Sequence, residues 1–219
     1  MLKLYEEEDR LEMGLDEVGR GCLWGPVVTC GVILRPDLDL EDPRLRWIRD
    51  SKKLSERRRN EMREFIVDSV ALDYHLDYVW QDEIDRLNIL HATMRSMHRC
   101  VDLIRTKPEF LLVDGSYFPR YPDPTIQHMT VEQGDATYMS IAAASILAKT
   151  ERDRWTLEEV SRRPDELRRY GLERNMGYGT EEHRSALFRY GLDPGSMHRR
   201  TFEPCKTICM GERIESIIG

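Results

Sequence analysis

The pattern of apolar and polar residues along this chain predicts five strands. The apolar run Val27–Leu34 and the short, wholly apolar run Phe110–Val113 predict strands, and the second run is typical of a strand buried on both faces in a parallel sheet. Alternation over Ala71–Trp80 predicts a third strand. Leu11–Glu17, followed by glycines and a Gly-Pro turn, and Thr125–Val131 complete the set.

Apolar residues at helical spacing predict the helices between and after these strands. The segments are Glu56–Val70, Glu83–Ile104 with a break or kink near Asn88, Tyr138–Val160, and Thr180–Phe188. Ser55 and Thr180 are predicted N-caps, and Gly191 is predicted to end the last helix. The small apolar residues of Ile141–Ala148 indicate that the longest helix packs closely on the sheet.

The order of these elements predicts an α/β protein with a mixed five-stranded sheet flanked by helices and a C-terminal helical segment. The first strands are expected to pair antiparallel, and the later strands are joined by helices. We expect one domain over residues 1–163 and a helical appendage over residues 164–219.

Composition excludes several classes of protein. No apolar run approaches the roughly 20 residues of a membrane helix, and the N-terminus lacks the pattern of a signal peptide, so a cytoplasmic protein without membrane contact is expected. The five cysteines are odd in number and form no Cys-x-x-Cys pair, which predicts reduced thiols. Cys205 and Cys209 are four apart, but the chain offers no second pair with zinc spacing.

The formal net charge of −7 argues against non-specific affinity for nucleic acid. It does not exclude nucleic acid as a substrate, because acids that hold divalent cations add negative charge to the chain. Basic residues are concentrated in Lys52–Arg59 and in His198–Arg200.

Four acids follow strands or precede a helix in a way that indicates a metal site. Asp16 and Glu17 close the first strand, Asp114 closes the buried strand, and Asp135 precedes the long helix. Sites in open α/β sheets gather beyond the carboxyl ends of the strands, so these acids meet if the first and fourth strands are neighbours. Ligands that are all oxygen favour Mg²⁺ or Mn²⁺, and two such ions are the usual clamp for phosphodiester hydrolysis.

Each acid also has a simpler explanation. Asp16 and Glu17 fit the mouth of a solvated hairpin, and adjacent strand residues face opposite sides unless the backbone distorts. Asp114 before Gly115 is an ordinary turn opening, and Asp135 is an ordinary acid at a helix start.

The ordered set of motifs resembles the bacterial ribonuclease HII family, the type 2 ribonucleases H. Ribonuclease HIII fits less well, because its members carry an extra N-terminal domain for which this chain has no room. The resemblance covers about residues 10 to 203. It is carried by Gly14-Leu15-Asp16-Glu17-Val18-Gly19-Arg20-Gly21, Asp50–Ser55, Val113-Asp114-Gly115, Gly134-Asp135, Ile141–Lys149 with Arg152-Asp153, Gly177-Tyr178-Gly179-Thr180 and His198–Phe202.

The resemblance implies a ribonuclease H-like fold and endonucleolytic cleavage of RNA paired with DNA, including incision 5′ of single ribonucleotides in duplex DNA. It implies hydrolysis assisted by two Mg²⁺ or Mn²⁺ ions, which leaves a 3′-hydroxyl and a 5′-phosphate. The helical appendage is then expected to complete the substrate groove. The implied metal-binding and catalytic residues are Asp16, Glu17, Asp114 and Asp135.

The resemblance also implies contacts with the substrate. The Gly19-Arg20-Gly21 step corresponds to the element that touches the 2′-hydroxyl at the RNA–DNA junction, where glycines let main-chain groups reach the ribose. Tyr178 corresponds to a tyrosine that packs on the next, deoxy, sugar, although a tyrosine beside a glycine-rich turn also suits a core or loop position. Ser51-Lys52-Lys53 and His198-Arg199-Arg200 would contact phosphates, or would simply be solvated charge.

Some positions depart from the family pattern. Met176 and Gln133 stand where lysines often occur, which would weaken phosphate contact, and Cys22 and Trp24 replace smaller residues or proline. No clamp-binding peptide is recognised at the C-terminus, and a monomer is expected. Two other functions remain open: another two-metal nuclease of the same fold, which would ignore a single ribonucleotide, and a non-catalytic module that binds nucleic acid.

Overall fold

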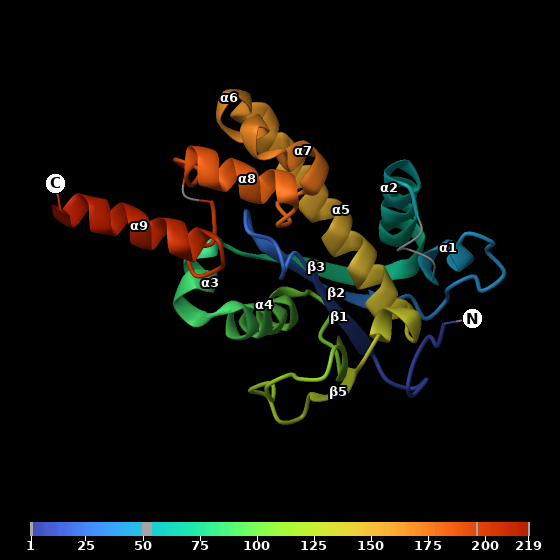
Figure 1. Ribbon diagram of the computed structural model, residues 1–219. Helices are drawn as coiled ribbons and strands as arrows, with labels where there is room; N and C mark the ends of the chain where they lie inside the picture. The colour runs from blue at the N-terminus through green and yellow to red at the C-terminus, as the bar shows by residue number, and fades with distance from the viewer. Residues whose placement is uncertain (1, 50–53, 196, 219) are drawn as a thin grey trace. The chain divides into compact units, whose positions relative to one another are not determined.

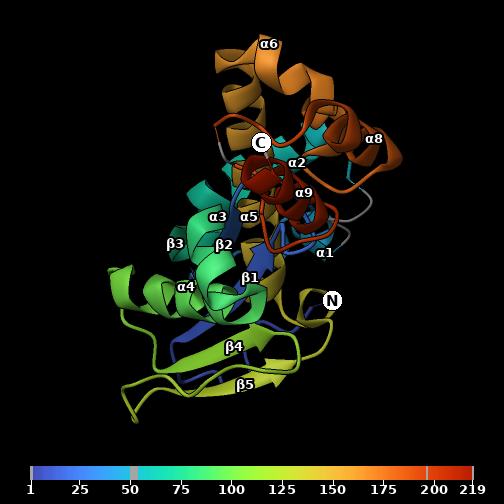
Figure 2. The ribbon, with the colours of Figure 1, turned by 60° about the vertical axis from the view of Figure 1, so that its left-hand side comes forward.

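A five-stranded mixed sheet organises the fold, with strand order β3-β2-β1-β4-β5. β1 pairs antiparallel with β2 and parallel with β4, and β4 pairs parallel with β5 (Figure 2). The predicted mixed sheet is therefore confirmed. The strands are β1 (Glu12–Val18), β2 (Val27–Leu34), β3 (Ala71–Val79), β4 (Phe110–Asp114) and β5 (Gln127–Val131).

The structure, a computed structural model, describes residues 2–49, 54–195 and 197–218. These residues form two compact units. Unit 1 comprises Met1–Val18, Val28–Tyr78 and Met94–Thr150, and unit 2 comprises Gly19–Val27, Val79–Thr93 and Glu151–Gly219. The expected division between residues 163 and 164 stays a prediction. Unit 1 lies wholly before that boundary, and unit 2 contains segments from both sides of it.

One face of the sheet in unit 1 is covered by α1 (Leu45–Arg49), α2 (Glu56–Phe65) and the first half of α5 (Met139–Arg162) (Figure 1). A single π-helical turn, Ile66–Val70, follows α2. Ser55 caps α2 as predicted, because its side chain accepts a hydrogen bond from the amide of Arg58.

Gly14 on β1 lets α5 approach the sheet very closely. A Cβ at Gly14 would collide with the backbone of Ser140 and Ile141 and would lie 2.6 Å from Ser140 Oγ. The small residues Ala142, Ala143 and Ala144 are all fully buried in the same contact region. The predicted close packing of this helix on the sheet is therefore confirmed.

The opposite face carries α4 (Ile89–Leu103), which follows α3 (Gln81–Leu87). Thr29 of β2 lies 2.6 Å from Ser96 and 3.3 Å from Cys100, both on α4. The predicted break near Asn88 separates two helices. Asn88 has a φ of 67°, and its side chain accepts a hydrogen bond from the amide of His91 in the first turn of α4.

Unit 2 has its own apolar core. Trp24, Tyr170 and Leu187 are fully buried there. Unit 2 contains α3 and the second half of α5. It also contains α6 (Pro164–Leu167), α7 (Leu172–Asn175), α8 (Glu181–Tyr190) and α9 (Cys205–Ile218). 3₁₀ turns occur at Gly134–Ala136 in unit 1 and at Arg168–Tyr170 in unit 2. Thr180 caps α8 as predicted, by accepting from the amide of His183. Within the described ranges, none of the helices has both the length and the apolar character needed to cross a membrane.

Candidate active site

Asp16 and Asp114 hold equivalent positions on neighbouring parallel strands. Leu15 and Val113 are the last register partners between β1 and β4, and the next residue on each strand is an acid. Residues two apart on a strand face the same side. Gly14 faces α5, so Asp16 faces α5 as well, and Leu112, the register partner of Gly14, packs against Ile141 of α5. The side chain of Asp114, two residues on, is therefore directed to the same face.

Asp135 lies near Asp114 because the residue before it, Gly134, is hydrogen-bonded to the Asp114 carboxylate. The amide of Gly134 donates a hydrogen bond to Asp114 Oδ1 at 2.7 Å, and Asp135 follows directly in the 3₁₀ turn that leads into α5. Asp135 is itself buried. The structure thus gathers Asp16, Asp114 and the turn that carries Asp135 at one end of the sheet in unit 1.

The electrostatics of Asp16 suit a cation. Burial raises the pKa of Asp16 well above its usual value, and the nearby charges of Glu17 and Asp114 raise it further, although Asp16 accepts hydrogen bonds from Ser145 and from the amide of Glu17. Carboxylates crowded in this way are stabilised by a divalent ion, and a donor set of oxygens alone fits Mg²⁺ or Mn²⁺. The residues present therefore fit such an ion. Within residues 2–49, 54–195 and 197–218, however, no three acid, histidine or cysteine side chains are already arranged as one ligand group.

Glu17 occupies a different position from Asp16. The antiparallel pairing of β1 with β2 continues without interruption through Glu17–Thr29 and Val18–Val28. Because register partners face the same side, Glu17 shares the direction of Thr29, whose hydroxyl contacts α4. The distortion that would turn both acids to one side is absent from this part of β1, although the charge of Glu17 still reaches Asp16.

The predicted substrate-contact residues all belong to unit 2. Arg20, Gly21 and Tyr178 are exposed, and Tyr178 is 38% exposed. Cys22, next to Gly21, forms an antiparallel bridge with Tyr178, and the amide of Leu23 donates to the carbonyl of Gly177 at 2.8 Å. Main-chain contacts therefore join the turn that carries Tyr178 to Cys22 and Leu23, which directly follow the Gly19–Gly21 loop.

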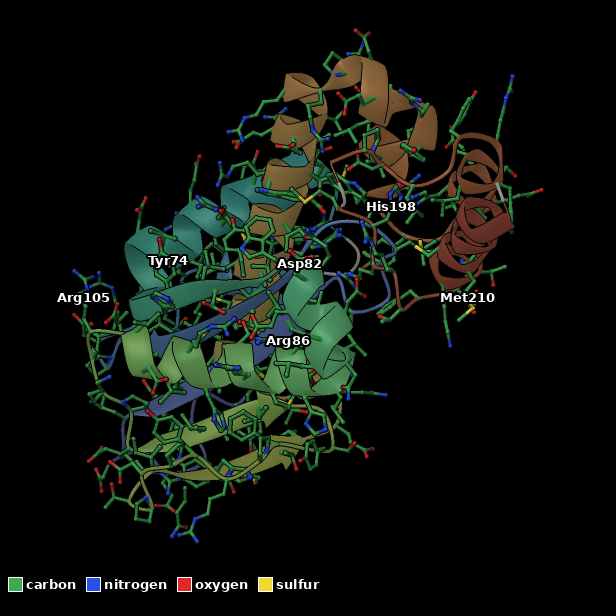
Figure 3. The ribbon with its side chains drawn as sticks, turned by 90° about the vertical axis from the view of Figure 1, so that its left-hand side faces the viewer. Tyr74, Asp82, Arg86, Arg105, His198 and Met210 are labelled. Atoms are coloured by element: carbon green, nitrogen blue, oxygen red, sulfur yellow. The ribbon has the colours of Figure 1, made fainter. Side chains whose placement is uncertain are left out.

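The predicted phosphate contacts of His198 and Arg199 are wrong, because both side chains are buried. His198 (Figure 3) is 1% exposed, and Arg199 is fully buried. The guanidinium of Arg199 donates to the carbonyl oxygens of Gly25 and Arg20 at 2.9–3.1 Å, so it holds the loop and is withdrawn from solvent. Burial lowers the pKa of Arg199 to about 10. Arg200 is exposed, and the expected contacts of Ser51, Lys52 and Lys53 lie outside the described residues.

The positions that depart from the family pattern have structural explanations in part. Met176 and Gln133 both adopt left-handed backbone, with φ of 49° and 56°. The carbonyl of Met176 accepts a hydrogen bond from Arg152 at 2.6 Å. Trp24 is fully buried, donates from its indole to Asp193 at 3.2 Å and stacks at 5.2 Å on Trp155.

Sequence reasoning did not identify a structural role for Arg152, a fully buried side chain on α5. Its guanidinium donates to three carbonyl oxygens of two loops. One signal was present in the sequence: Ala144, Ala148 and Arg152 are four residues apart, so the arginine continues a buried face of the helix.

Comparison with known sequences matches nearly the whole chain. A sequence profile of ribonuclease HII matches residues 13–205. The ribonuclease HII of Bacteroides fragilis (strain YCH46) is 44% identical over 202 residues, which are 92% of this chain and 94% of that protein. The ribonuclease HII of Cytophaga hutchinsonii is 44% identical over 199 residues, 90% of this chain and 92% of that protein.

Solved structures with the same fold include the crystal structure of ribonuclease H2 from Pyrococcus horikoshii. It matches with a TM-score of 0.70 at 26% identity, over 92% of this chain and 98% of that one. The ribonuclease HII of Archaeoglobus fulgidus, solved as a complex with PCNA, matches with a TM-score of 0.66 at 26% identity, over 87% of this chain and 94% of that one. Bst-RNase HIII in complex with Mn²⁺ has a TM-score of 0.62 at 18% identity, over 92% of this chain and 70% of that one, which shows the fold alone.

Proposed function

Because this chain belongs to the ribonuclease HII family, we propose that it incises duplex DNA on the 5′ side of a single embedded ribonucleotide. The family and the fold make it an endonuclease that acts on RNA paired with DNA. The finer substrate preference is supported by the exposure of Arg20 and Gly21 and by the main-chain contacts of Cys22 and Leu23, which follow them, with the Tyr178 turn.

The catalytic part of the proposal rests on the parallel pairing of β1 with β4. Asp16 and Asp114 directly follow Leu15 and Val113, the last register partners of the two strands, so the two acids lie side by side. We assign Asp16, Asp114 and Asp135 as the residues that hold divalent ions. We assign Glu17, which faces the other side of β1 but whose charge reaches Asp16, as a fourth ligand near the end of that strand. Bound Mg²⁺ or Mn²⁺ would supply Lewis acidity that activates water and stabilises the leaving 3′-oxygen. The carboxylates provide the charge that retains the ions, and Ser145 and the amide of Glu17 orient Asp16 by hydrogen bonds.

Recognition of the ribonucleotide is assigned to main-chain atoms of the Gly19–Gly21 loop. A Cβ at Gly21 would meet nothing within 4 Å, so the loop presents open backbone at this position. The 2′-hydroxyl both donates and accepts hydrogen bonds, and it is the group that distinguishes RNA from DNA. The partly exposed ring of Tyr178 would pack on the following deoxyribose, where a 2′-hydroxyl would collide with it.

Three duplexes of one sequence test this function: one all-DNA, one with a single ribonucleotide, and one with an RNA strand paired to DNA. With Mn²⁺ we expect cuts in the second and third duplexes, with a 3′-hydroxyl left 5′ of the single ribonucleotide, and no cuts when a chelator is present. Asp16→Asn should abolish cleavage while Asp68→Asn, a change of an exposed acid in the same unit, should leave it intact. An uncut single-ribonucleotide duplex, or wild-type turnover in Asp16→Asn, contradicts the proposal.

A further inference from the structure

Arg152 has an unusual set of hydrogen-bond partners for a fully buried charge. Its Nε donates to the carbonyl of Pro26 at 2.9 Å, one terminal nitrogen donates to Trp24 at 3.0 Å, and the other donates to Met176 at 2.6 Å. All three acceptors are main-chain oxygens. Two belong to the segment that follows Gly21, and the third belongs to the turn that precedes Tyr178.

The same side chain fills the space beneath two glycines. A Cβ at Gly19 would collide with Nε of Arg152 and lie 2.8 Å from its Cδ, and a Cβ at Gly177 would lie 3.2 Å from one of its terminal nitrogens. Both glycines have left-handed backbone, with φ of 94° and 84°. Gly19 begins the loop assigned to the 2′-hydroxyl, and Gly177 directly precedes Tyr178, so one guanidinium is in contact with both recognition elements.

The tyrosine itself lies near the same group. The guanidinium carbon of Arg152 is 5.9 Å from the centre of the Tyr178 ring, within the range of a cation–π interaction. Burying a charge whose hydrogen bonds go to neutral carbonyls is unfavourable in itself. A planar fork with five fixed donors can, however, set the spacing of several carbonyls at once, which the ammonium of a lysine cannot do.

We propose that Arg152 is a positioning residue that fixes the Gly19–Gly21 loop relative to Tyr178. It thereby sets the preference for a ribonucleotide followed by a deoxynucleotide. This inference rests on the proposed function, because it takes the loop and Tyr178 as the parts that contact the two sugars. The spacing of these two parts has to match one sugar-to-sugar step, and displacements of about 1 Å can reduce turnover by about 100-fold.

The test compares Arg152→Lys and Arg152→Gln with Arg154→Lys and Arg154→Gln. Arg154 is two residues away on α5, is half exposed and pairs with Glu151 and Glu158, so it controls for loss of an arginine from this helix. For each protein, kcat and KM are measured on the single-ribonucleotide duplex and on the RNA–DNA hybrid. The selectivity is the ratio of the two kcat/KM values.

We expect Arg152→Gln to lower the selectivity at least 10-fold and Arg152→Lys to lower it several-fold. The loss should lie mainly in kcat, with KM changed less than about threefold. Both Arg154 variants should keep the wild-type selectivity. A purely structural role predicts a lower melting temperature with the selectivity unchanged. Arg152→Lys keeps the charge and most of the volume, so it decides the question if Arg152→Gln does not fold.

The outcomes separate the two proposals. If the wild-type enzyme cuts the single-ribonucleotide duplex and a folded Arg152 variant keeps the full selectivity, the positioning role is refuted and the proposed function stands. If the wild-type enzyme does not cut that duplex, the proposed function fails first. The Mn²⁺-induced rise in melting temperature gives a further readout, and it should be the same in the Arg152→Lys variant as in the wild type, since the acids are in unit 1.

Discussion

The Nε2 atoms of His183 and His198 lie 3.0 Å apart, in the interior of unit 2. The amide of Asp193 donates to Nδ1 of His198, so the proton of a neutral His198 is on Nε2 and is donated to His183. Nδ1 of His183 then carries its proton and donates to the carbonyl of Tyr178 at 3.0 Å. This chain of hydrogen bonds requires both rings to be neutral, and it ends on the main chain of a residue assigned to substrate contact.

The histidine pair predicts a loss of stability in mild acid. Burial and the neighbouring His183 lower the pKa of His198 to about 3, below the value of about 6.5 in the unfolded chain. The unfolded state therefore binds more protons between these values, and stability present above pH 6.5 is lost as the pH falls toward 3. Below about pH 6, we expect His198 to lower the free energy of unfolding by about 1 kcal/mol for each unit by which the pH falls. Urea unfolding at a series of pH values measures this loss.

His198→Gln should reduce the slope of the unfolding free energy against pH by the amount that corresponds to the uptake of about one proton on unfolding. His91→Gln, which changes an exposed histidine, should leave the slope unchanged. Equal slopes for wild type and His198→Gln would show that His198 is not held neutral.

The two glycines of the Gly19-Arg20-Gly21 step should respond differently to alanine. Gly19 has a left-handed φ of 94° and lies against Arg152. Gly21 does not have a left-handed φ, and a Cβ added there would meet open space. Gly19→Ala should destabilise the protein by about 1–3 kcal/mol through left-handed strain and collision. Gly21→Ala should change stability by less than about 0.5 kcal/mol but raise KM for the single-ribonucleotide duplex. Urea midpoints and steady-state kinetics separate the two effects, and an equally unstable Gly21→Ala would contradict this account.

Divalent ions should stabilise the fold through Asp16. At a concentration of 100 times the dissociation constant, Mn²⁺ would add about 2.7 kcal/mol to the free energy of unfolding. Asp16→Asn should lose most of the resulting rise in melting temperature. Without divalent ions it should melt above the wild type, because it removes a buried charge that Glu17 and Asp114 repel. A full Mn²⁺ response in Asp16→Asn, measured by differential scanning calorimetry, would exclude Asp16 as a ligand.

Lysines at positions 133 and 176, where the family often carries them, should strengthen contact with substrate phosphates. Met176→Lys and Gln133→Lys each add one positive charge, and one extra phosphate contact steepens the dependence of log KM on log salt concentration by about 0.7–0.9. Gln127→Lys is the matched control, because Gln127 begins β5, at the opposite end from Val131, the register partner of Asp114. A steeper slope in the control as well would attribute the effect to net charge alone.

Local patterns were sufficient to predict most elements of the fold. The caps at Ser55 and Thr180 depend on residues within one helical turn, so the sequence alone identifies them. The bounds of β2 match those of the mainly apolar run Val27–Leu34. The placement of Asp16 beside Asp114 was conditional on the first and fourth strands being neighbours, and the pairing of β1 with β4 meets that condition.

The parts that could not be predicted involve main-chain partners. His198 and Arg199 were interpreted as surface charge because a basic cluster is usually solvated, but Arg199 donates to carbonyl oxygens of Gly25 and Arg20. Every residue has a carbonyl, so a sequence contains no sign of such an acceptor. The same reason explains why the contacts of Arg152 were missed.

The contact at Gly14 has a consequence for the dimensions of the proposed ion site. Gly14 contributes no functional group, yet the missing methyl group fixes how near Ser140 and Ile141 come to β1. Asp16 is two residues further along that strand, and Asp135 stands just ahead of the helix that carries Ser140 and Ile141. A methyl group at Gly14 would move α5 away from β1 and so increase the distance between Asp16 and Asp135. The absence of a side chain at Gly14 therefore keeps these two acids close enough to bind one small ion.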